Sequence, residues 1–233
     1  TLRKIPVCIN PVFSRSLAES ALLFILALSK RLPHLTQDAL NGRPLSGARG
    51  IEIRGKTVGL IGFGRIGRET ADLCQRLDMS VMAYDPYIIK GNVPAWCQLV
   101  SLNQLLENAD FIVLTAPLTP ESIHMIAEPQ FKLMKPTAYL VNIARGPLVD
   151  ENALRVALET EQIAGAALDA WEVEPVQKDN PLLRFENIIP TPHKIGATWE
   201  SLEQVCRSIQ ENIFRVMENK PPLYVINPEI YTV

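Results

Sequence analysis

The sequence lacks the features of several specialised classes of protein. Its longest uninterrupted apolar run is eight residues, Ala21–Leu28. A membrane-spanning helix needs about 20 apolar residues, so this run predicts a buried helix instead. The 23 Lys and Arg and the 25 Asp and Glu give a formal net charge of −2 and form no basic block. We therefore expect neither nucleic acid nor a membrane as a partner.

Cysteine is scarce and scattered. The residues Cys8, Cys74, Cys97 and Cys206 form no Cys-x-x-Cys pair and have no paired histidine beside them. This spacing predicts neither a disulfide framework nor a metal site. Because reduced thiols are typical of the cytosol, we expect a cytoplasmic protein with mostly buried cysteines.

Short β-branched or apolar runs alternate with helical patterns along most of the chain, as in a parallel α/β sheet. Runs that are apolar on both faces, such as Phe111–Leu114, fit central strands covered by helices on both sides. Helices are expected near 65–77, 101–107, 122–134 and 150–160. The expected strands, which together predict an α/β fold with a doubly wound parallel sheet, are 57–61, 81–84, 111–114, 138–142, 165–168 and 188–189.

A glycine-rich loop follows the first of these strands. In Gly62-Phe-Gly64-Arg-Ile-Gly67, the first glycine allows a tight turn, the second admits a pyrophosphate, and the third lets the next helix pack closely. The N-terminus of that helix favours a phosphate. Asp85 ends the next strand, 18 residues after Gly67, where a carboxylate accepts hydrogen bonds from the adenosine ribose. The pattern predicts a Rossmann-type NAD site, with NAD favoured over NADP because Asp85 would repel a 2′-phosphate.

The two ends of the chain have a different pattern. Residues 5–9 and 223–226 are predicted as short strands, 198–218 as a helix, and 14–31 as a long helix whose apolar middle must be covered on both faces. We assign residues 12–193 to the dinucleotide-binding domain. Residues 1–11 and 194–233 are expected to be parts of a second domain.

Three later segments carry side chains suited to catalysis. They are Asn142-Ile-Ala-Arg145-Gly146, Asp169-Ala-Trp-Glu-Val-Glu174-Pro175 and Thr191-Pro-His193. Each follows a predicted strand, and open α/β sheets bind their ligands beyond the carboxyl ends of the strands. Because many chemistries share this fold, the function has to be argued from these residues.

Together with the glycine loop, these motifs resemble the D-isomer-specific 2-hydroxyacid dehydrogenase family. That family combines an Asn-x-Ala/Ser-Arg-Gly segment, an Asp-x-Phe-x-x-Glu-Pro segment and a Pro-His segment in the same order. The resemblance runs from about residue 6 to residue 228. It implies an NAD-dependent oxidoreductase that acts on a small D-2-hydroxy acid or 2-oxo acid, such as glyoxylate, hydroxypyruvate or a phosphoglycerate-like acid.

The resemblance also implies roles for individual residues. Arg145 would bind the substrate carboxylate and polarise the C2 carbonyl, His193 would transfer the proton, and Glu174 would orient His193. Asp169 would contact the nicotinamide side of the cofactor. No metal is expected. The expected cofactor-binding residues are Gly62, Gly64, Arg65, Ile66, Gly67, Asp85, Ala116, Pro117, Ile143, Ala144, Arg145, Asp169, His193 and Gly196.

Two departures from the family pattern matter for the site and for the domain organisation. Ile195 stands where the family usually has Gly or Ala, so either the loop bulges by one residue or Ile195 crowds the nicotinamide. The resemblance also begins partway through the family pattern. It implies a flavodoxin-like substrate domain whose first part, on the order of 80 to 100 residues, precedes Thr1.

Several alternatives stay open from the sequence. Glu172 competes with Glu174 as the working acid, although the family pattern places that acid directly before the proline. His34 and His124 are expected to be structural or to face solvent, and Trp171 and Trp199 fit either the core or the mouth of the site.

Other functions and the oligomeric state also have to be weighed. One alternative function is an NAD(H)-sensing protein that resembles the family's corepressors, although their Ala-Ala-Trp segment after the histidine is missing here. Another is phosphite oxidation, which uses a similar Arg, Glu and His set. Formate is disfavoured because a Gln-His pair is absent. The resemblance further implies a homodimer, with the helix 14–31 at its interface.

Overall fold

The computed structural model describes residues 5–43 and 49–231. Two compact units divide the chain: Leu17–Ile195, and the described residues up to Ser16 together with those from Gly196 onward. The sequence-based assignment of the second unit to a substrate domain stays a prediction.

The helices, strands and short 3-10 turns are α1 (Ser14–Ser29), α2 (Leu32–Leu40), β1 (Thr57–Ile61), α3 (Arg65–Gln75), β2 (Ser80–Tyr84), η1 (Lys90–Asn92), β3 (Cys97–Leu99), α4 (Leu102–Asn108), β4 (Phe111–Leu114), α5 (Glu128–Phe131), β5 (Tyr139–Asn142), η2 (Gly146–Leu148), α6 (Glu151–Glu159), β6 (Gly165–Leu168), η3 (Pro181–Arg184), β7 (Ile188–Pro190), α7 (Trp199–Met217) and η4 (Pro228–Tyr231).

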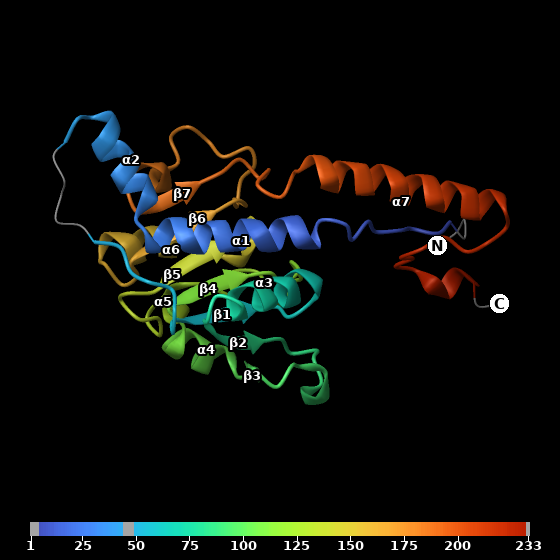
Figure 1. The fold of residues 1–233 in the computed structure, drawn as a ribbon, viewed down its shortest axis with the longest axis horizontal. Helices are drawn as coiled ribbons and strands as arrows, with labels where there is room; N and C mark the ends of the chain where they lie inside the picture. Colours follow the sequence, from blue (N-terminus) through green and yellow to red (C-terminus); the bar gives the residue numbers. More distant parts are fainter. Residues whose placement is uncertain (1–4, 44–48, 232–233) are drawn as a thin grey trace. The chain divides into compact units, whose positions relative to one another are not determined.

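The larger unit is built on a parallel sheet of seven strands in the order β3-β2-β1-β4-β5-β6-β7. The strand order reverses between β1 and β4, which is the topological switch point of a doubly wound sheet. Figure 1 shows the strands stacked side by side with α1 and α3 in front of them. The predicted α/β fold is therefore confirmed.

Two apolar layers cover the two faces of this sheet. Phe24, Ile25 and Leu28 of α1 pack with Ala71 and Cys74 of α3 against one face. Residues from α4, α5 and α6 pack against the other face. Every residue of β4 is buried, as expected for a central strand with helices on both sides.

Three predictions about individual elements need correction. The sheet has a seventh strand, β3, which its three residues were too few to indicate. The helix predicted over 14–31 ends at Ser29, and α2 follows after Arg31, whose φ is 54°. The helix predicted over 122–134 is only α5, because Ile126 pairs with Val149 in a parallel bridge.

The smaller unit contains α7 and one short antiparallel contact. Cys8 and Val225 form a β-bridge, Ile9 N–H donates to Tyr224 O at 3.1 Å, and Ile226 N–H donates to Val7 O at 2.9 Å. The predicted strands at 5–9 and 223–226 are thus reduced to one bridge between them.

Candidate functional site

The glycine loop lies where β1 ends and α3 begins. Gly62 has a φ of +94°, and a Cβ added there would lie 2.6 Å from the backbone nitrogen of Ala116. A Cβ on Gly67 would lie 2.3 Å from Gly62 O. Both positions therefore require glycine for close backbone packing.

Gly64 has a different environment. It is the N-cap of α3, makes no side-chain capping bond, and would have open space within 4 Å of an added Cβ. The first N–H groups of α3 are thus approachable from this side, and a helix N-terminus favours an anion. The loop fits the pyrophosphate of a dinucleotide. Arg65 and Ile66, also predicted as contacts, form the first turn of α3.

Asp85 follows β2 and faces the same loop. Its Oδ2 accepts a hydrogen bond from Phe63 N–H at 2.8 Å, and its Oδ1 accepts one from Tyr87 N–H at 3.0 Å. Asp85 lines a cavity of about 140 Å³ together with Gly62, Ala116 and Pro117. Four residues predicted to bind the cofactor therefore share one hollow.

Arg145 lies in a turn after β5 that Asn142 holds in place. The buried Asn142 side chain accepts a hydrogen bond from Ala144 N–H at 3.0 Å and donates one to Arg145 O at 3.0 Å. The carboxamide thus closes the turn, while Ile143 and Ala144 are buried and Arg145 is exposed. This role of Asn142 was not predicted from the sequence, although its place at the end of a strand was a signal.

Glu174 and His193 form the central contact of the candidate site. His193 Nδ1 lies 2.8 Å from each carboxylate oxygen of Glu174, and both side chains are 39% exposed. Burial raises the pKa of Glu174, but hydrogen bonds from His193 and from the Trp171 N–H, with the positive charges of His193 and Arg145, lower it further than burial raises it. Because an ionised carboxylate only accepts hydrogen bonds, Nδ1 carries the proton and Nε2 is left for a ligand.

Asp169 holds the turn that carries His193. The Asp169 side chain is buried, and its Oδ1 accepts hydrogen bonds from Thr191 Oγ1 at 2.7 Å, Lys194 N–H at 3.0 Å and Ile195 N–H at 3.2 Å. This turn needs support, because His193 has a φ of 58°, a conformation that is uncommon outside glycine. The side chain of Ile195 packs with the apolar cluster that includes α1.

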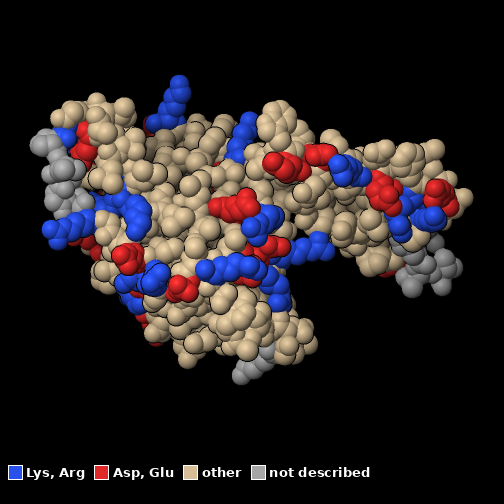
Figure 2. Space-filling model, in the orientation of Figure 1, with Lys and Arg blue, Asp and Glu red and all other residues tan. Residues whose placement is uncertain are grey.

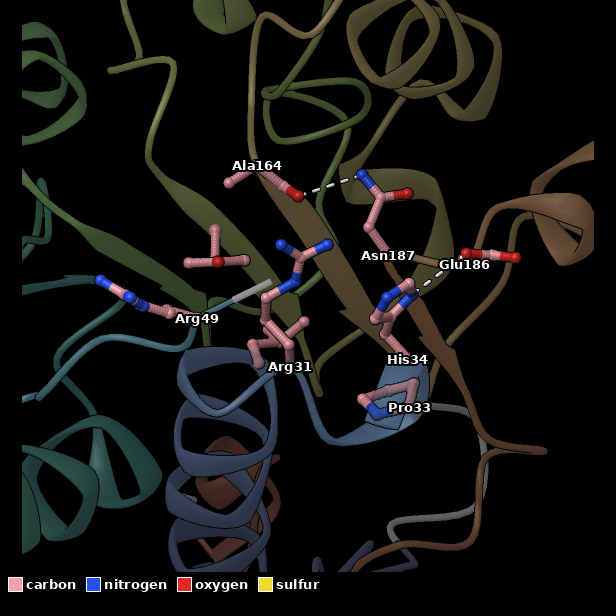
Figure 3. Close-up of a pocket in the computed structure, with 9 residues that line it drawn as sticks. Arg31, Pro33, His34, Arg49, Ala164, Glu186 and Asn187 are labelled. Carbon is pink, nitrogen blue, oxygen red and sulfur yellow. Dashed lines mark hydrogen bonds and ion pairs between the residues drawn. The ribbon is translucent and has the colours of Figure 1, made fainter. Parts of the chain in front are cut away.

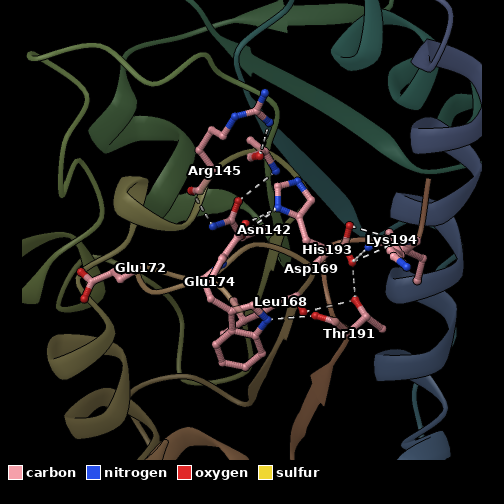
Figure 4. Close-up of polar contacts among 12 residues, drawn as sticks. Asn142, Arg145, Leu168, Asp169, Glu172, Glu174, Thr191, His193 and Lys194 are labelled. Atoms are coloured by element: carbon pink, nitrogen blue, oxygen red, sulfur yellow. Dashed lines mark hydrogen bonds and ion pairs between the residues drawn. The ribbon is translucent and has the colours of Figure 1, made fainter. Parts of the chain in front are cut away.

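Figure 4 shows which predicted residues converge. The side chains of Asn142, Glu174 and His193 lie together beside the Arg145 turn, whereas Glu172 points away from them. Glu172 Oε1 lies 2.7 Å from His124 Nε2. Of the two competing acids, Glu174 is therefore the one that contacts the histidine.

The remaining predicted residues lie outside this cluster. Gly196 is buried, and its carbonyl accepts a hydrogen bond from Ser16 Oγ at 2.5 Å. Trp171 is 2% exposed and lies in the core, whereas Trp199 is 84% exposed. His34 contacts Glu186 and Asp38.

Among the four cysteines, Cys74 and Cys97 are buried, while Cys8 and Cys206 are exposed, which corrects the expectation of mostly buried thiols.

A second hollow of about 380 Å³ lies at the amino ends of β5, β6 and β7 (Figure 3). Arg31, His34, Tyr139 and Asn187 line it. None of the predicted site residues lines this hollow.

Within residues 5–43 and 49–231, no group of His, Cys, Asp and Glu has the arrangement of a metal site. Over the same ranges, each helix is too short or too polar to cross a membrane.

The fold and the site together define a class of protein. A doubly wound sheet carries a glycine loop and an acid for a dinucleotide, and an arginine and a histidine–carboxylate pair lie beyond the carboxyl ends of β5, β6 and β7. This combination is that of a nicotinamide-dependent oxidoreductase domain.

Comparison with known proteins identifies the family. Residues 22–194 match the D-isomer specific 2-hydroxyacid dehydrogenase, NAD binding domain. The chain belongs to this family. Because the matching family model describes an NAD-binding domain, the prediction of NAD as the cofactor is confirmed.

Three relatives illustrate the range of the family. The chain is 39% identical over 214 residues to a D-3-phosphoglycerate dehydrogenase of Archaeoglobus fulgidus, covering 91% of this chain but 41% of that protein. It is 36% identical to a glyoxylate reductase of Thermofilum pendens, covering 100% of this chain and 71% of that protein. The structure of the D-lactate dehydrogenase with NAD⁺ from Lactobacillus jensenii matches with a TM-score of 0.86 and 30% identity, over 95% of this chain and 72% of that one. The chain thus spans less than half of the phosphoglycerate dehydrogenase it matches.

Proposed function

We propose that the protein reduces a small 2-oxo acid to the D-2-hydroxy acid, and catalyses the reverse oxidation, with NAD(H). The observation that carries this proposal is the 2.8 Å contact of His193 Nδ1 with Glu174, beside the Arg145 turn. The three relatives named above act on different acids, so they support the reaction class without naming the substrate.

The mechanism that we propose gives a role to each of three side chains. The Arg145 guanidinium binds the substrate carboxylate and polarises the C2 carbonyl through a planar pair of donors. His193 donates the Nε2 proton to the carbonyl oxygen during reduction and accepts it during oxidation. Glu174 holds the Nδ1 proton and stabilises the imidazolium. The chemistry that the nicotinamide supplies when bound is hydride transfer at C2.

The cofactor preference that we propose is NAD rather than NADP. Asp85 lies at the end of β2 in the cavity that we assign to the adenosine ribose, and Glu121 lines the same cavity. Two carboxylates near a 2′-phosphate would repel it, because like charges at short range are unfavourable. Comparing the KM values for NADH and NADPH tests this preference.

We further propose that the smaller unit is part of the substrate domain and that the intact protein is a cytoplasmic homodimer. Support for the dimer comes from the exposed apolar side chains of α1 and α2, namely Leu23, Leu32, Leu35 and Leu40. Leu23 and Leu32 also line a groove of about 690 Å³ that runs beside β7. A second copy of the chain would remove this surface from water.

The proposed reaction is tested by following NADH absorbance with the intact protein. The panel is glyoxylate, hydroxypyruvate, pyruvate, 2-oxoglutarate and phosphohydroxypyruvate, and the control variant is His193→Ala. We expect turnover of at least one acid, reduced by a factor of about 100 or more in the variant. Tight NADH binding without turnover of any of these acids would contradict the proposal.

A further inference from the structure

We propose that Trp171 is a positioning residue for catalysis, which holds Glu174, His193 and the Arg145 turn in register; this inference rests on the function proposed above. Trp171 lies in the segment after β6, and its side chain is 2% exposed. It touches neither substrate nor cofactor in this proposal. Its effect is exerted through its neighbours.

Two hydrogen bonds connect Trp171 to the histidine–carboxylate pair. Its backbone N–H donates to Glu174 Oε1 at 3.1 Å. Its indole Nε1–H donates to Thr191 O at 2.9 Å, two residues before His193 (Figure 4). Trp171 therefore binds the Glu174 carboxylate through its backbone N–H and the backbone of the histidine turn through its indole N–H.

The histidine turn needs contacts on both sides. His193 has a φ of 58°, and an uncommon backbone conformation persists only where the surrounding structure holds it. After His193, Asp169 accepts hydrogen bonds from Lys194 N–H and Ile195 N–H. Before it, Thr191 N–H donates to Leu168 O at 2.9 Å, and Thr191 O accepts from the indole. The indole is the only one of these partners whose donor can be removed by changing a side chain without altering a charge.

The Arg145 turn rests on the other side of Trp171. A Cβ added to Gly146 would lie 1.9 Å from both the carbonyl carbon and the carbonyl oxygen of Trp171. The two backbones are therefore in direct contact, and the position of Trp171 limits that of Arg145. The buried indole has its N–H paired with Thr191 O, as is usual for a buried tryptophan, so the ring also joins the Arg145 turn to the histidine turn.

The chain departs from the family motif at this residue. The resemblance is to Asp-x-Phe-x-x-Glu-Pro, and Trp171 occupies the position of the phenylalanine. A phenyl ring fills an apolar site but has no N–H group. Trp171→Phe therefore removes the donor to Thr191 and leaves the backbone N–H to Glu174 unchanged.

The test compares Trp171→Phe with Trp96→Phe in the intact protein. Trp96 is 40% exposed and lies just before β3, so it is a matched control for the same substitution. We expect kcat of Trp171→Phe to fall about tenfold, since the partly buried carbonyl of Thr191 has lost its donor and the histidine turn one of its contacts. The KM for NADH should stay at the wild-type value, and Trp96→Phe should keep both constants.

A second measurement does not depend on turnover. In protein labelled with ¹⁵N-histidine, the imidazole signal of His193 is assigned by its loss in His193→Gln. We expect that signal to change in Trp171→Phe, together with its dependence on pH, whereas the signal of His34 stays in place. A residue that only fills the core would leave the His193 titration unchanged.

The outcomes separate the two proposals. If the wild type turns over no 2-oxo acid, the proposed function fails, and the His193 signal alone decides the role of Trp171. If Trp171→Phe keeps the wild-type kcat and the wild-type His193 signal, the positioning role is wrong. If Trp171→Phe does not fold, benzothienylalanine at position 171 keeps the ring shape without the N–H, and the same two measurements decide.

Discussion

At the scale of single residues, the tautomer of His193 depends on the charge of Glu174. The lowered pKa of Glu174 keeps this carboxylate ionised, and both of its oxygens lie 2.8 Å from Nδ1. An ionised acceptor holds the proton on Nδ1 and stabilises the imidazolium when Nε2 is protonated. A neutral amide would supply neither effect in full.

Glu174→Gln tests this dependence. We expect kcat to fall by a factor of about 100, because general acid–base catalysis contributes at least that much and the amide carries no charge. The matched control is Glu172→Gln, which makes the same change at the acid that contacts His124. Equal losses in the two variants would contradict the choice of Glu174 as the working acid.

The pKa of Glu174 also predicts how stability depends on pH. A carboxyl whose pKa is lower in the folded than in the unfolded state stabilises the fold above the unfolded pKa, and this contribution is lost as pH falls through the folded pKa. We expect the difference in melting temperature between wild type and Glu174→Gln to shrink as the pH falls below the ordinary glutamate pKa of 4.5. A difference that instead grew in favour of the wild type as the pH fell through this range would show the opposite shift.

The residues that contact the cofactor and substrate in our proposal could be named from the sequence, but those that hold them could not. Spacing and order placed Glu174 and His193 after neighbouring strands, which brings them to one edge of the sheet. The positive φ of His193 and the indole bond to Thr191 depend on contacts between segments about 20 residues apart. No local pattern specifies such contacts.

At the scale of elements, the turns after β5 and β6 pack back to back. Gly146→Ala would place a Cβ 1.9 Å from the Trp171 carbonyl, so one of the two turns must move. We expect a loss of about 2 kcal/mol in the free energy of unfolding, as for an overpacked core, and a rise in the KM for the 2-oxo acid.

The control for this prediction is Gly91→Ala. Gly91 has no atom within 4 Å of an added Cβ, so the same substitution meets open space there. Chemical denaturation of both variants gives the comparison. If Gly146→Ala were as stable as Gly91→Ala, the tight contact between the two turns would be wrong.

Element boundaries were predicted well only where the pattern is local. The strands β1, β4 and β6 fall on the predicted residues because their apolar runs are bounded by turn residues. Residues 122–126 have a helical pattern, yet His124 N–H donates to Pro147 O and Ile126 N–H donates to Leu148 O. These contacts join segments more than 20 residues apart and replace the helix with turns and one β-bridge residue, Ile126, beside the Arg145 turn.

At the scale of the whole molecule, α1 and α2 leave apolar surface uncovered in a single chain. Leu32 is 51% exposed and Leu35 is 41% exposed, both on α2. The all-round apolarity of the α1 segment predicted a need for cover on both faces. In the single chain, the sheet covers one face through Phe24 and Ile25, while Leu23 stays 52% exposed.

The dimer proposal predicts that a charge on this surface dissociates the protein. We expect the variant with Leu32→Asp and Leu35→Asp to be a monomer by light scattering at concentrations where the wild type is a dimer, because burying an unpaired carboxylate in an interface costs several kcal/mol. Val156→Asp is the control, since Val156 is similarly exposed, at 40%, on α6. A monomeric wild type would contradict the dimer, and a double variant that stayed dimeric would show that the interface does not include Leu32 and Leu35. A monomeric variant that kept its kcat would show that each copy holds a complete set of catalytic residues.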